Sequence, residues 1–462
     1  MKKIFVLLFL IPLVTFCFAD GTAQISDEQI SHFDSYLDEI TEAYHIPGMA
    51  FFITDSEKTV FSKTFGQCRS MDQNFFVGSI SKSYTALSVM RLVEMGLINL
   101  DDDISVYLPE YSFPKKVSVL SLLNHTSGFN THAKLHNAKI TGSYGKYEYA
   151  NVNYDLLGKI VEKVSGKSFA EYVQENIFTP IGMSKSQADA KKMKGDKNLL
   201  LGNRNFFGIF VTGDADYPNE KSWFHEPAGF MNLTPNDHAK YLRMYLNGGI
   251  TKQGERIVKK ETIDSMWYEN VPIGSDNAFY GRGWNYMEHD GMKIVFHGGQ
   301  VENYISYMFI LPEKNLAVCF MVNGNDEFGM NELMDNAFWD SLSILKGAEP
   351  KKVNHAEYVL IHTALDLAYL LVIMFSVFLL IKAFRGNRKK YGKGGVRKII
   401  LAILGYAVWP FLLLFCTKIF FGTPLWVVKS YVPDLYLTIL TGSALSIFGG
   451  AVKIAKALGK KK

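Results

Sequence analysis

The chain has 462 residues, enough for two to four domain-sized units, and 48% of them are hydrophobic but unevenly placed along the sequence. Its four cysteines do not make a disulfide framework. The formal net charge is only +4, and the excess of basic residues lies near the C-terminal end between apolar stretches, which argues against a nucleic-acid partner.

The first residues have the pattern of a secretory signal peptide, predicted at residues 1–19. Two lysines form a short basic head, the stretch 4–18 is almost wholly apolar, and Ala19 is the small residue expected before a cleavage site. An uncleaved membrane anchor is the alternative interpretation. A signal of this kind implies that the region after it lies outside the cytoplasm.

Strand patterns occur at both ends of the region that follows. Residues 49–55 and 59–65 are expected to pair around a turn. Later strands are expected at 293–296, 304–311 and 316–322. Helical patterns dominate the residues between these two groups. The sequence therefore predicts an α+β fold: an antiparallel sheet built from both ends of the region and flanked by helices, with an all-helical insertion.

The most informative motif is Ser79-Ile80-Ser81-Lys82, where a loop gives way to a helical pattern that ends near Gly96. Positions three apart share one face of a helix, so the Lys82 amine is expected one turn from the Ser79 hydroxyl. A serine is a poor nucleophile until a base takes its proton, and a desolvated lysine can help to do so. Because Ser-x-x-Lys is short, it is weak evidence by itself.

Two further motifs strengthen that evidence. Tyr149 and Asn151, one residue apart, stand just before apolar positions at 154–161 that are spaced as the buried face of a helix. His297, followed by two glycines, ends an apolar run that is typical of a strand. The chain thus carries, in order, a serine with a lysine, a tyrosine with an asparagine, and a basic residue with glycine on a strand.

In this order the motifs resemble those of the serine penicillin-recognising hydrolases. Because its second motif begins with tyrosine, the chain resembles one branch of these hydrolases: class C β-lactamases, DD-peptidases, D-aminopeptidases and related esterases. Collinear stretches at 122–129, 178–183 and 227–237 extend the resemblance over about residues 30 to 340. It implies a β-lactamase/transpeptidase-like domain, which we place at residues 25–345.

The resemblance implies a mechanism through a covalent acyl-enzyme. Ser79 would attack an amide or ester carbonyl, while Lys82 and Tyr149 share the task of accepting and returning the proton. A tyrosine has a reference pKa of about 10 and acts as a base only where positive charge lowers it, and Lys82 is the expected source of that charge. The backbone N–H groups of Ser79 and, by resemblance, Gln300 would hold the oxyanion.

Substrate-binding roles are implied for residues of the second and third motifs. Asn151 would orient Lys82 or the substrate amide. His297, with Gly298 and Gly299, occupies the position where β-lactamases usually carry lysine. Histidine is only partly charged near neutral pH, so it suits the carboxylate of a β-lactam less well than lysine does. A peptidase or amidase is therefore favoured over a β-lactamase.

The arrangement of signal, hydrolase region and C-terminal apolar helices resembles membrane-bound peptidases that remove an acylated D-amino acid from prodrug natural products during export. Residues 154–158 and 297–300, with Asn303, are similar to that subgroup. The resemblance adds Asn303 to the substrate-binding residues. Phe76 departs from the pattern, because the subgroup has an acidic residue three positions before its serine.

No cofactor or metal site is expected. The histidines at 125, 132 and 136 lack the His-Glu-x-x-His spacing, and no cysteine pair supports a zinc site. Of the four cysteines, Cys68 and Cys319 lie in strand-like runs of the hydrolase region. Two free, buried thiols are expected there, with a disulfide as the alternative.

After the hydrolase region, residues 346–357 are typical of a polar linker. Three apolar stretches follow, each long enough to cross a bilayer as a helix of roughly 20 residues, at 358–381, 399–421 and 432–452. Seven basic residues lie at 385–398, between the first two stretches, against only Lys429 in the opposite loop, and a basic tail follows at 453–462. By the positive-inside rule the basic loop and tail are cytoplasmic, which places the hydrolase region in the periplasm or at the outer surface.

His362 and Asp366 fall inside the first apolar stretch. Ionisable residues within a membrane segment are costly and therefore have partners. A polar contact between helices is expected here, with a functional site as the alternative.

The sequence therefore predicts a membrane-anchored, extracytoplasmic serine hydrolase acting on amide bonds. A D-amino-acid peptidase or amidase is favoured, with a cell-wall peptide or an N-acyl-D-peptide prodrug as substrate; a carboxylesterase or class C-like β-lactamase is the alternative. A β-lactam sensor without turnover is the alternative of another class, although the short cytoplasmic parts leave it no effector. The expected partners are a small peptide, amide or ester substrate, the lipid bilayer, and export or cell-envelope machinery.

Overall fold

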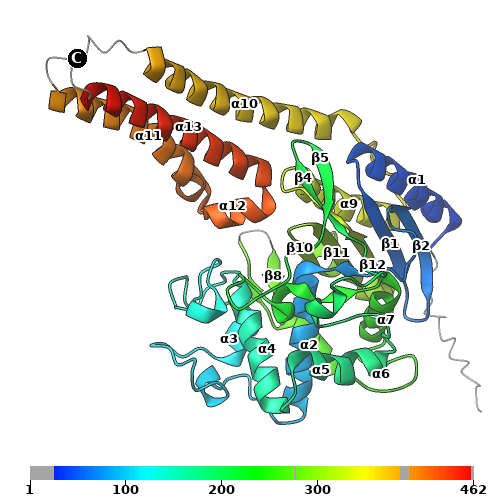
Figure 1. Ribbon diagram of the computed structural model, residues 1–462. Helices are drawn as coiled ribbons and strands as arrows, with labels where there is room; N and C mark the ends of the chain where they lie inside the picture. Colours follow the sequence, from blue (N-terminus) through cyan, green and yellow to red (C-terminus); the bar gives the residue numbers. More distant parts are fainter. Residues whose placement is uncertain (1–24, 275–276, 386–394, 459–462) are drawn as a thin grey trace, which may run out of the picture.

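Figure 1 shows the computed structural model, which describes residues 25–274, 277–385 and 395–458. The predicted signal peptide, residues 386–394 of the basic loop and residues 459–462 of the tail lie outside the described residues. The described chain forms a sheet with helices on both faces, followed by long helices that extend away from it (Figure 1).

An eight-stranded antiparallel sheet organises the hydrolase region, in the order β2-β1-β12-β11-β10-β9-β8-β7. β1 (Gly48–Thr54) pairs with β2 (Thr59–Gly66) on one side and with β12 (Leu316–Val322) on the other, so strands from both ends of the region are neighbours. The remaining strands are β7 (Val271–Pro272), β8 (Ala278–Tyr280), β9 (Asn285–His289), β10 (Met292–Val301) and β11 (Tyr304–Leu311). The predicted α+β fold with an antiparallel sheet is confirmed.

Helices cover both faces of the sheet, which explains why its central strands are apolar at almost every position. Phe51 and Phe320 point to one face and Phe52 and Cys319 to the other, because successive side chains of a strand alternate. One face packs with α1 (Asp27–Ala43) and α9 (Met330–Leu345), and the other with α2 (Ser81–Glu94), α4 (Asn151–Ser165) and α7 (Pro235–Leu246). Cys68 and Cys319 are both free and buried, which confirms the two predicted thiols.

The insertion between the two groups of strands is not all-helical, contrary to the prediction. Its other helices are α3 (Val119–Leu123), α5 (Phe169–Val173), α6 (Thr179–Ile181) and α8 (Lys260–Tyr268). A hairpin of β4 (Gly202–Phe206) and β5 (Ile209–Gly213) interrupts them, and β4 also pairs with β13 (Gly324–Asn325). The hairpin turn is Phe207-Gly208, with φ of 52° and 75°. Two residues at positive φ suit a tight hairpin. Phenylalanine is not expected at positive φ, so the sequence gives no signal for this turn.

Short strands also pair within the hydrolase region. β3 (Phe75–Phe76) lies antiparallel to β6 (Asn232–Leu233). This pairing joins the segment before Ser79 to the segment before α7.

Three long helices follow the hydrolase region: α10 (His355–Arg385), α11 (Gly395–Phe421) and α13 (Pro433–Leu458). Each contains a segment long and apolar enough to cross a membrane. α10 and α11 both pack along α13. The connection between α11 and α13 is not only a loop, since it contains the short helix α12 (Leu425–Tyr431), which lies at the end of α11 and α13 nearer the sheet (Figure 1).

α10 is joined to the hydrolase region by buried polar contacts. Its His362 Nε2 lies 2.6 Å from Asp326 Oδ2, just after β13, and Asn205 Nδ2 of β4 donates to the Tyr358 hydroxyl at 2.7 Å. The predicted helix-to-helix contact of His362 is therefore wrong. The reason is that α10 begins at His355, before the apolar stretch starts, so its first turns lie against the hydrolase region.

Candidate active site

Ser79 lies in a short 3₁₀ turn immediately before α2, beside the end of β10. Gly78 has φ of +53°, and a Cβ atom there would lie 2.1 Å from the backbone nitrogen of Gln300. A Cβ atom on Gly299 would likewise lie 3.0 Å from the backbone nitrogen of Ser79. Glycine at both positions therefore lets the turn and the strand approach backbone to backbone.

The Lys82 side chain is fully buried and ends between three oxygen atoms. Its Nζ lies 2.9 Å from Ser79 Oγ, 2.7 Å from Asn151 Oδ1 and 2.6 Å from the carbonyl oxygen of Ala228. Burial lowers the pKa of the amine well below its ordinary value. A neutral amine has two N–H groups and one lone pair, so when Asn151 and Ala228 accept the N–H groups, the lone pair faces the Ser79 hydroxyl.

Tyr149 contacts the same serine, because its hydroxyl donates to Ser79 Oγ at 2.8 Å. Burial raises the pKa of Tyr149, although the bond to Ser79 opposes the shift. Lys82 Nζ lies 4.8 Å from the centre of the tyrosine ring. The predicted lowering of the tyrosine pKa by Lys82 is therefore wrong. The lysine is so buried that its own charge is disfavoured, and the tyrosine stays protonated.

His297 lies on β10 and is 2% exposed. Its Nδ1 donates to the Gly298 carbonyl at 2.6 Å, so its Nε2 accepts from the Tyr280 hydroxyl at 3.2 Å. Burial is the main cause that lowers the pKa of His297 to about 3, and a charge on Lys82 would act in the same direction. The partial positive charge expected at this position is therefore absent, and the ring is neutral.

The end of β10 directs a backbone N–H group away from its neighbour β11. Val301 and Tyr304 close a two-residue turn, and pairs along an antiparallel ladder alternate between hydrogen-bonded and non-hydrogen-bonded positions. Gln300 faces Ile305 and falls on a non-hydrogen-bonded position. Its N–H therefore points outward, beside the turn that carries Ser79. Two neighbouring backbone donors are what an oxyanion requires.

Two cavities open onto Ser79. One of about 460 Å³ is lined by Ser79, Tyr149, His297, Gly298, Gly299 and Gln300, among others. The other, of about 470 Å³, includes Ser79, Tyr149, Asn151 and Gln300 and extends to α12. Lys82 lies beneath them. The structure thus gathers the predicted site residues around Ser79, with one exception.

That exception is Asn303, which lines neither cavity. It lies in the turn between β10 and β11, is 1% exposed, and its Nδ2 is 3.4 Å from the carbonyl oxygen of Gly213 on β5. Its own carbonyl accepts from the backbone N–H of Asn203 at 3.2 Å. The predicted substrate contact of Asn303 is therefore corrected: the side chain packs the β10–β11 turn against the β4–β5 hairpin.

Two further groups contribute to the site and were not predicted from the sequence. Tyr280 of β8 bonds His297, and its ring centre lies 6.3 Å from that of Tyr149. The Ala228 carbonyl, which bonds Lys82, belongs to a π-helical turn at Glu226–Phe230. Neither carries a sequence signal, because Tyr280 stands outside every motif and a backbone carbonyl exists at every residue.

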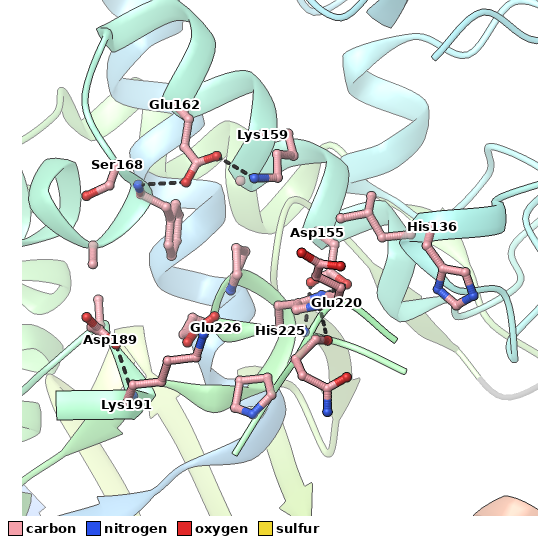
Figure 2. A pocket seen from close by; sticks show the side chains of 18 of the residues that line it. His136, Asp155, Lys159, Glu162, Ser168, Asp189, Lys191, Glu220, His225 and Glu226 are labelled. Atoms are coloured by element: carbon pink, nitrogen blue, oxygen red, sulfur yellow. Dashed lines mark hydrogen bonds and ion pairs between the residues drawn. The ribbon is translucent and has the colours of Figure 1, made fainter. Parts of the chain in front are cut away.

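A separate cavity of about 560 Å³ does not include Ser79 (Figure 2). In it Asp155, one turn along α4 from Asn151, accepts from the backbone N–H of His225 at 3.0 Å and from its Nδ1 at 2.9 Å. Burial opposes a charge on His225, but the bond to Asp155 outweighs it and raises the pKa of the imidazole. His225 directly precedes the π-helical turn, so this pair positions the Ala228 carbonyl that bonds Lys82.

The contacts around Ser79 define the chemistry that the site can support. A hydroxyl lies between an amine whose pKa burial lowers and a phenol whose pKa burial raises, with two backbone N–H groups nearby. This set suits acyl transfer through a serine. Among the described residues, no group of three or more His, Cys, Asp or Glu side chains is gathered as a metal site.

Comparison with known proteins gives a family match over most of the hydrolase region. Residues 33–337 match the family model described as Beta-lactamase. Protein flp of Staphylococcus aureus strain MRSA252 is 21% identical over 422 residues, covering 81% of this chain and 78% of that protein. For the same protein of strain N315, identity is 22% and 65% of its length is covered. Penicillin-binding protein 4 of Amycolatopsis lactamdurans is 23% identical over 328 residues, covering 64% of this chain and 85% of that protein.

Two solved structures have a similar fold. The octameric penicillin-binding protein homologue from Pyrococcus abyssi matches with a TM-score of 0.59 and 27% identity, over 70% of this chain and 78% of that one. A D-stereospecific amidohydrolase from Streptomyces sp. matches with a TM-score of 0.52 and 19% identity, over 65% of this chain and 94% of that one. At that identity the second match shows the fold alone.

Proposed function

The chain belongs to the beta-lactamase family, and from that premise we propose that it is a membrane-anchored serine hydrolase, a D-amino-acid peptidase or amidase. One observation carries the proposal: Ser79 Oγ lies 2.9 Å from the buried amine of Lys82 and 2.8 Å from the hydroxyl of Tyr149. A hydroxyl held in this way can give its proton to the amine and keep a hydrogen-bond donor as it attacks.

The proposed reaction proceeds through an acyl-enzyme. Ser79 Oγ attacks the carbonyl carbon of an amide while its proton passes to Lys82. The carbonyl oxygen becomes an oxyanion, held by the backbone N–H groups of Ser79 and Gln300. Tyr149 gives its proton to the departing nitrogen as the C–N bond breaks, and the proton that Lys82 took from Ser79 then restores the phenol. Water then hydrolyses the ester by the reverse set of proton transfers.

The charge of the site supports an amide rather than a β-lactam as substrate. The position that carries lysine in β-lactamases is occupied by His297, which is neutral because it is buried. It offers no fixed positive charge to the carboxylate of a β-lactam. The preference for D-residues rests on the relatives, which include a penicillin-binding protein, and on the chain's resemblance to D-peptidases.

The proposed location is a cell membrane, with the hydrolase region outside the cytoplasm. Three helices are long and apolar enough to span a bilayer. Seven basic residues lie between the first two spans, at 385–398, whereas the segment 422–431 between the last two has only Lys429. Cationic loops are retained on the cytoplasmic side during insertion, so α12 and the hydrolase region share the outer side.

The test uses the full chain purified in detergent. Wild type should hydrolyse D-amino-acid amides or N-acyl-D-peptides, with slower turnover of nitrocefin, and a fluorescent phosphonate should label it covalently. Ser79→Ala should lose labelling and about 10⁶-fold in turnover, as removal of a nucleophilic serine does elsewhere. Ser83→Ala is the matched control, because that hydroxyl bonds the Ile80 carbonyl and not the site. Undiminished labelling of the Ser79 variant would overturn the proposal.

A further inference from the structure

The hairpin of β4 and β5 carries apolar side chains on both of its faces. Phe210 packs against the hydrophobic core on one face, while Ile209 is 67% and Val211 51% exposed. Successive side chains of a strand alternate between its faces, so Ile209 and Val211 share the opposite face, which we call the outer face of the hairpin. An antiparallel strand with one face in water normally places polar side chains on that face. The outer face is apolar instead.

The turn of this hairpin is held against the long C-terminal helices. The backbone N–H of Phe207 donates to Asp434 Oδ2 at 3.3 Å, and its ring centre lies 6.2 Å from that of Tyr369. A Cβ atom on Gly208 would lie 3.4 Å from the Cβ of His362. Figure 1 shows the hairpin pointing from the large sheet toward α10. The turn therefore contacts both α10 and α13.

These contacts fix the depth of the turn relative to the candidate membrane spans. The span of α13 begins at Pro433, directly before Asp434. On α10 the contacts at His362 and Tyr369 come about two and about four helical turns after that span begins at His355. In the proposed location the turn therefore lies where the two spans enter the bilayer from its outer side.

The composition of the hairpin suits that boundary. Residues 199–213 include no acidic residue, and Arg204 is their only charged residue. Among the described strands, β5 is the edge strand of its three-stranded sheet. The backbone groups on its free edge need water or lipid headgroups as hydrogen-bond partners, because the hydrocarbon interior offers none. The headgroup region of a bilayer accommodates both the apolar side chains and the free strand edge.

We infer that the outer face of the hairpin enters the headgroup region of the bilayer, as a membrane contact of the hydrolase region in addition to the three helices. This inference rests on the proposed membrane location. Exposed apolar surface marks an interaction site, and the bilayer is its partner because the turn is fixed at the point where α10 and α13 enter the lipid. Two separate contacts with the bilayer would also restrict how the hydrolase region tilts above it.

The test attaches the environment-sensitive fluorophore NBD to a cysteine on the outer face. The full chain, with Cys17→Ser and Cys416→Ser, is placed at one copy per lipid nanodisc; the two remaining cysteines are buried. Labels on Ile209→Cys and Val211→Cys should emit at shorter wavelength than in water. They should also lose most of their fluorescence when lipid with a nitroxide on its headgroup replaces plain lipid, because a nitroxide quenches only at close range.

Two matched positions serve as controls. Val106 is 65% exposed and belongs to the segment after α2, which Figure 1 shows at the end of the hydrolase region away from the long helices. A label on Val106→Cys should keep its fluorescence. Ile447 of α13 is 56% exposed within a candidate span, so a label on Ile447→Cys should be quenched by lipid with a nitroxide on its acyl chain. Phosphonate labelling of Ser79 reports that each variant is folded.

The outcomes separate the hairpin from the anchor. If the labels at positions 209 and 211 behave like the label at 106 while the label at 447 is quenched, the inference is overturned and the proposed membrane location stands. A shift to shorter wavelength that appears only in discs with two copies would assign the outer face to a second copy of the chain, which also overturns the inference. If the label at 447 escapes quenching as well, the proposed location fails and the inference fails with it.

Discussion

The proton of Ser79 could pass to either of two neighbouring groups, Lys82 or Tyr149. The opposite directions of their pKa shifts distinguish the two. Burial lowers the pKa of Lys82 and raises the pKa of Tyr149. In the proposed reaction the amine is therefore the base and the phenol a proton donor. Because only a neutral amine accepts a proton, the acylation rate should rise with pH through the pKa of Lys82 and level off above it, at a pH well below the ordinary 10.5 of lysine.

Tyr149→Phe removes one hydrogen bond of 2.8 Å to Ser79 and leaves the three contacts of Lys82 in place. Loss of a positioned proton donor typically costs about 10²–10⁴-fold in rate. The variant should lose that factor in kcat/KM at every pH, with the midpoint of the rise unmoved. Lys82→Arg introduces a permanent charge that cannot be deprotonated, so it should abolish acylation throughout.

The assay is the second-order rate constant for labelling by a fluorescent phosphonate, measured across the accessible pH range, because this constant reports the pKa values of the free enzyme. Tyr280→Phe is the matched control: it also removes a buried phenol, but one that bonds His297 instead of Ser79. Its loss should cost less than about ten-fold. If Tyr149→Phe shifts or removes the rise with pH, then the tyrosine is the base and our reasoning from burial is refuted.

Three further predictions test the backbone approach, the support of β10 and the topology. Gly78→Ala should abolish labelling, because its Cβ would lie 2.1 Å from a backbone nitrogen of β10. Gly96→Ala is the control: Gly96 has φ of +72° but no atom within 4 Å of the added Cβ, so this variant should change only the melting temperature. Asn325→Ala removes two bonds to the end of β10, at 2.9 and 2.6 Å, and should lower kcat by about ten- to 100-fold with little change in KM; an equal rise in KM would contradict this. A cysteine at position 387 should resist impermeant thiol reagents in cells whose outer layers are permeable, and one at 354 should react; the reverse pattern would place the site in the cytoplasm.

The parts of the fold that could be predicted are those in which burial dictates residue type. β11 and β12 are covered on both faces, so their apolar runs at 304–311 and 316–322 coincide with the strands. The β4–β5 hairpin could not be predicted, because its turn places Phe207 at positive φ and its exposed strands, at Ile209 and Val211, lack a buried face. α12 was missed because a short helix between two spans has no periodicity of its own.

The candidate site likewise has one part that the sequence predicts and one part that it does not. Ser79 and Lys82 follow from helical spacing, and the other motifs from their order along the chain. The electrostatics could not be predicted, because a motif fixes which groups meet but not how deeply they are buried. Lys82, Tyr149 and His297 all shift their pKa chiefly through burial, and each shift changes the chemistry that charge alone had suggested.

The C-terminal helices contribute to the candidate site as well as to the proposed membrane anchor. Gln300, whose N–H lies beside Ser79, donates from its side chain to Asn325 and Glu327, each at 2.9 Å. Between them in sequence, Asp326 is held by His362 of α10 at 2.6 Å. A segment of three residues thus ties the end of β10 to α10, while α12 lines one of the two cavities at Ser79. Because a well-placed donor is worth several kcal/mol to an oxyanion only when it is rigid, the C-terminal helices help to set the geometry on which the proposed chemistry depends.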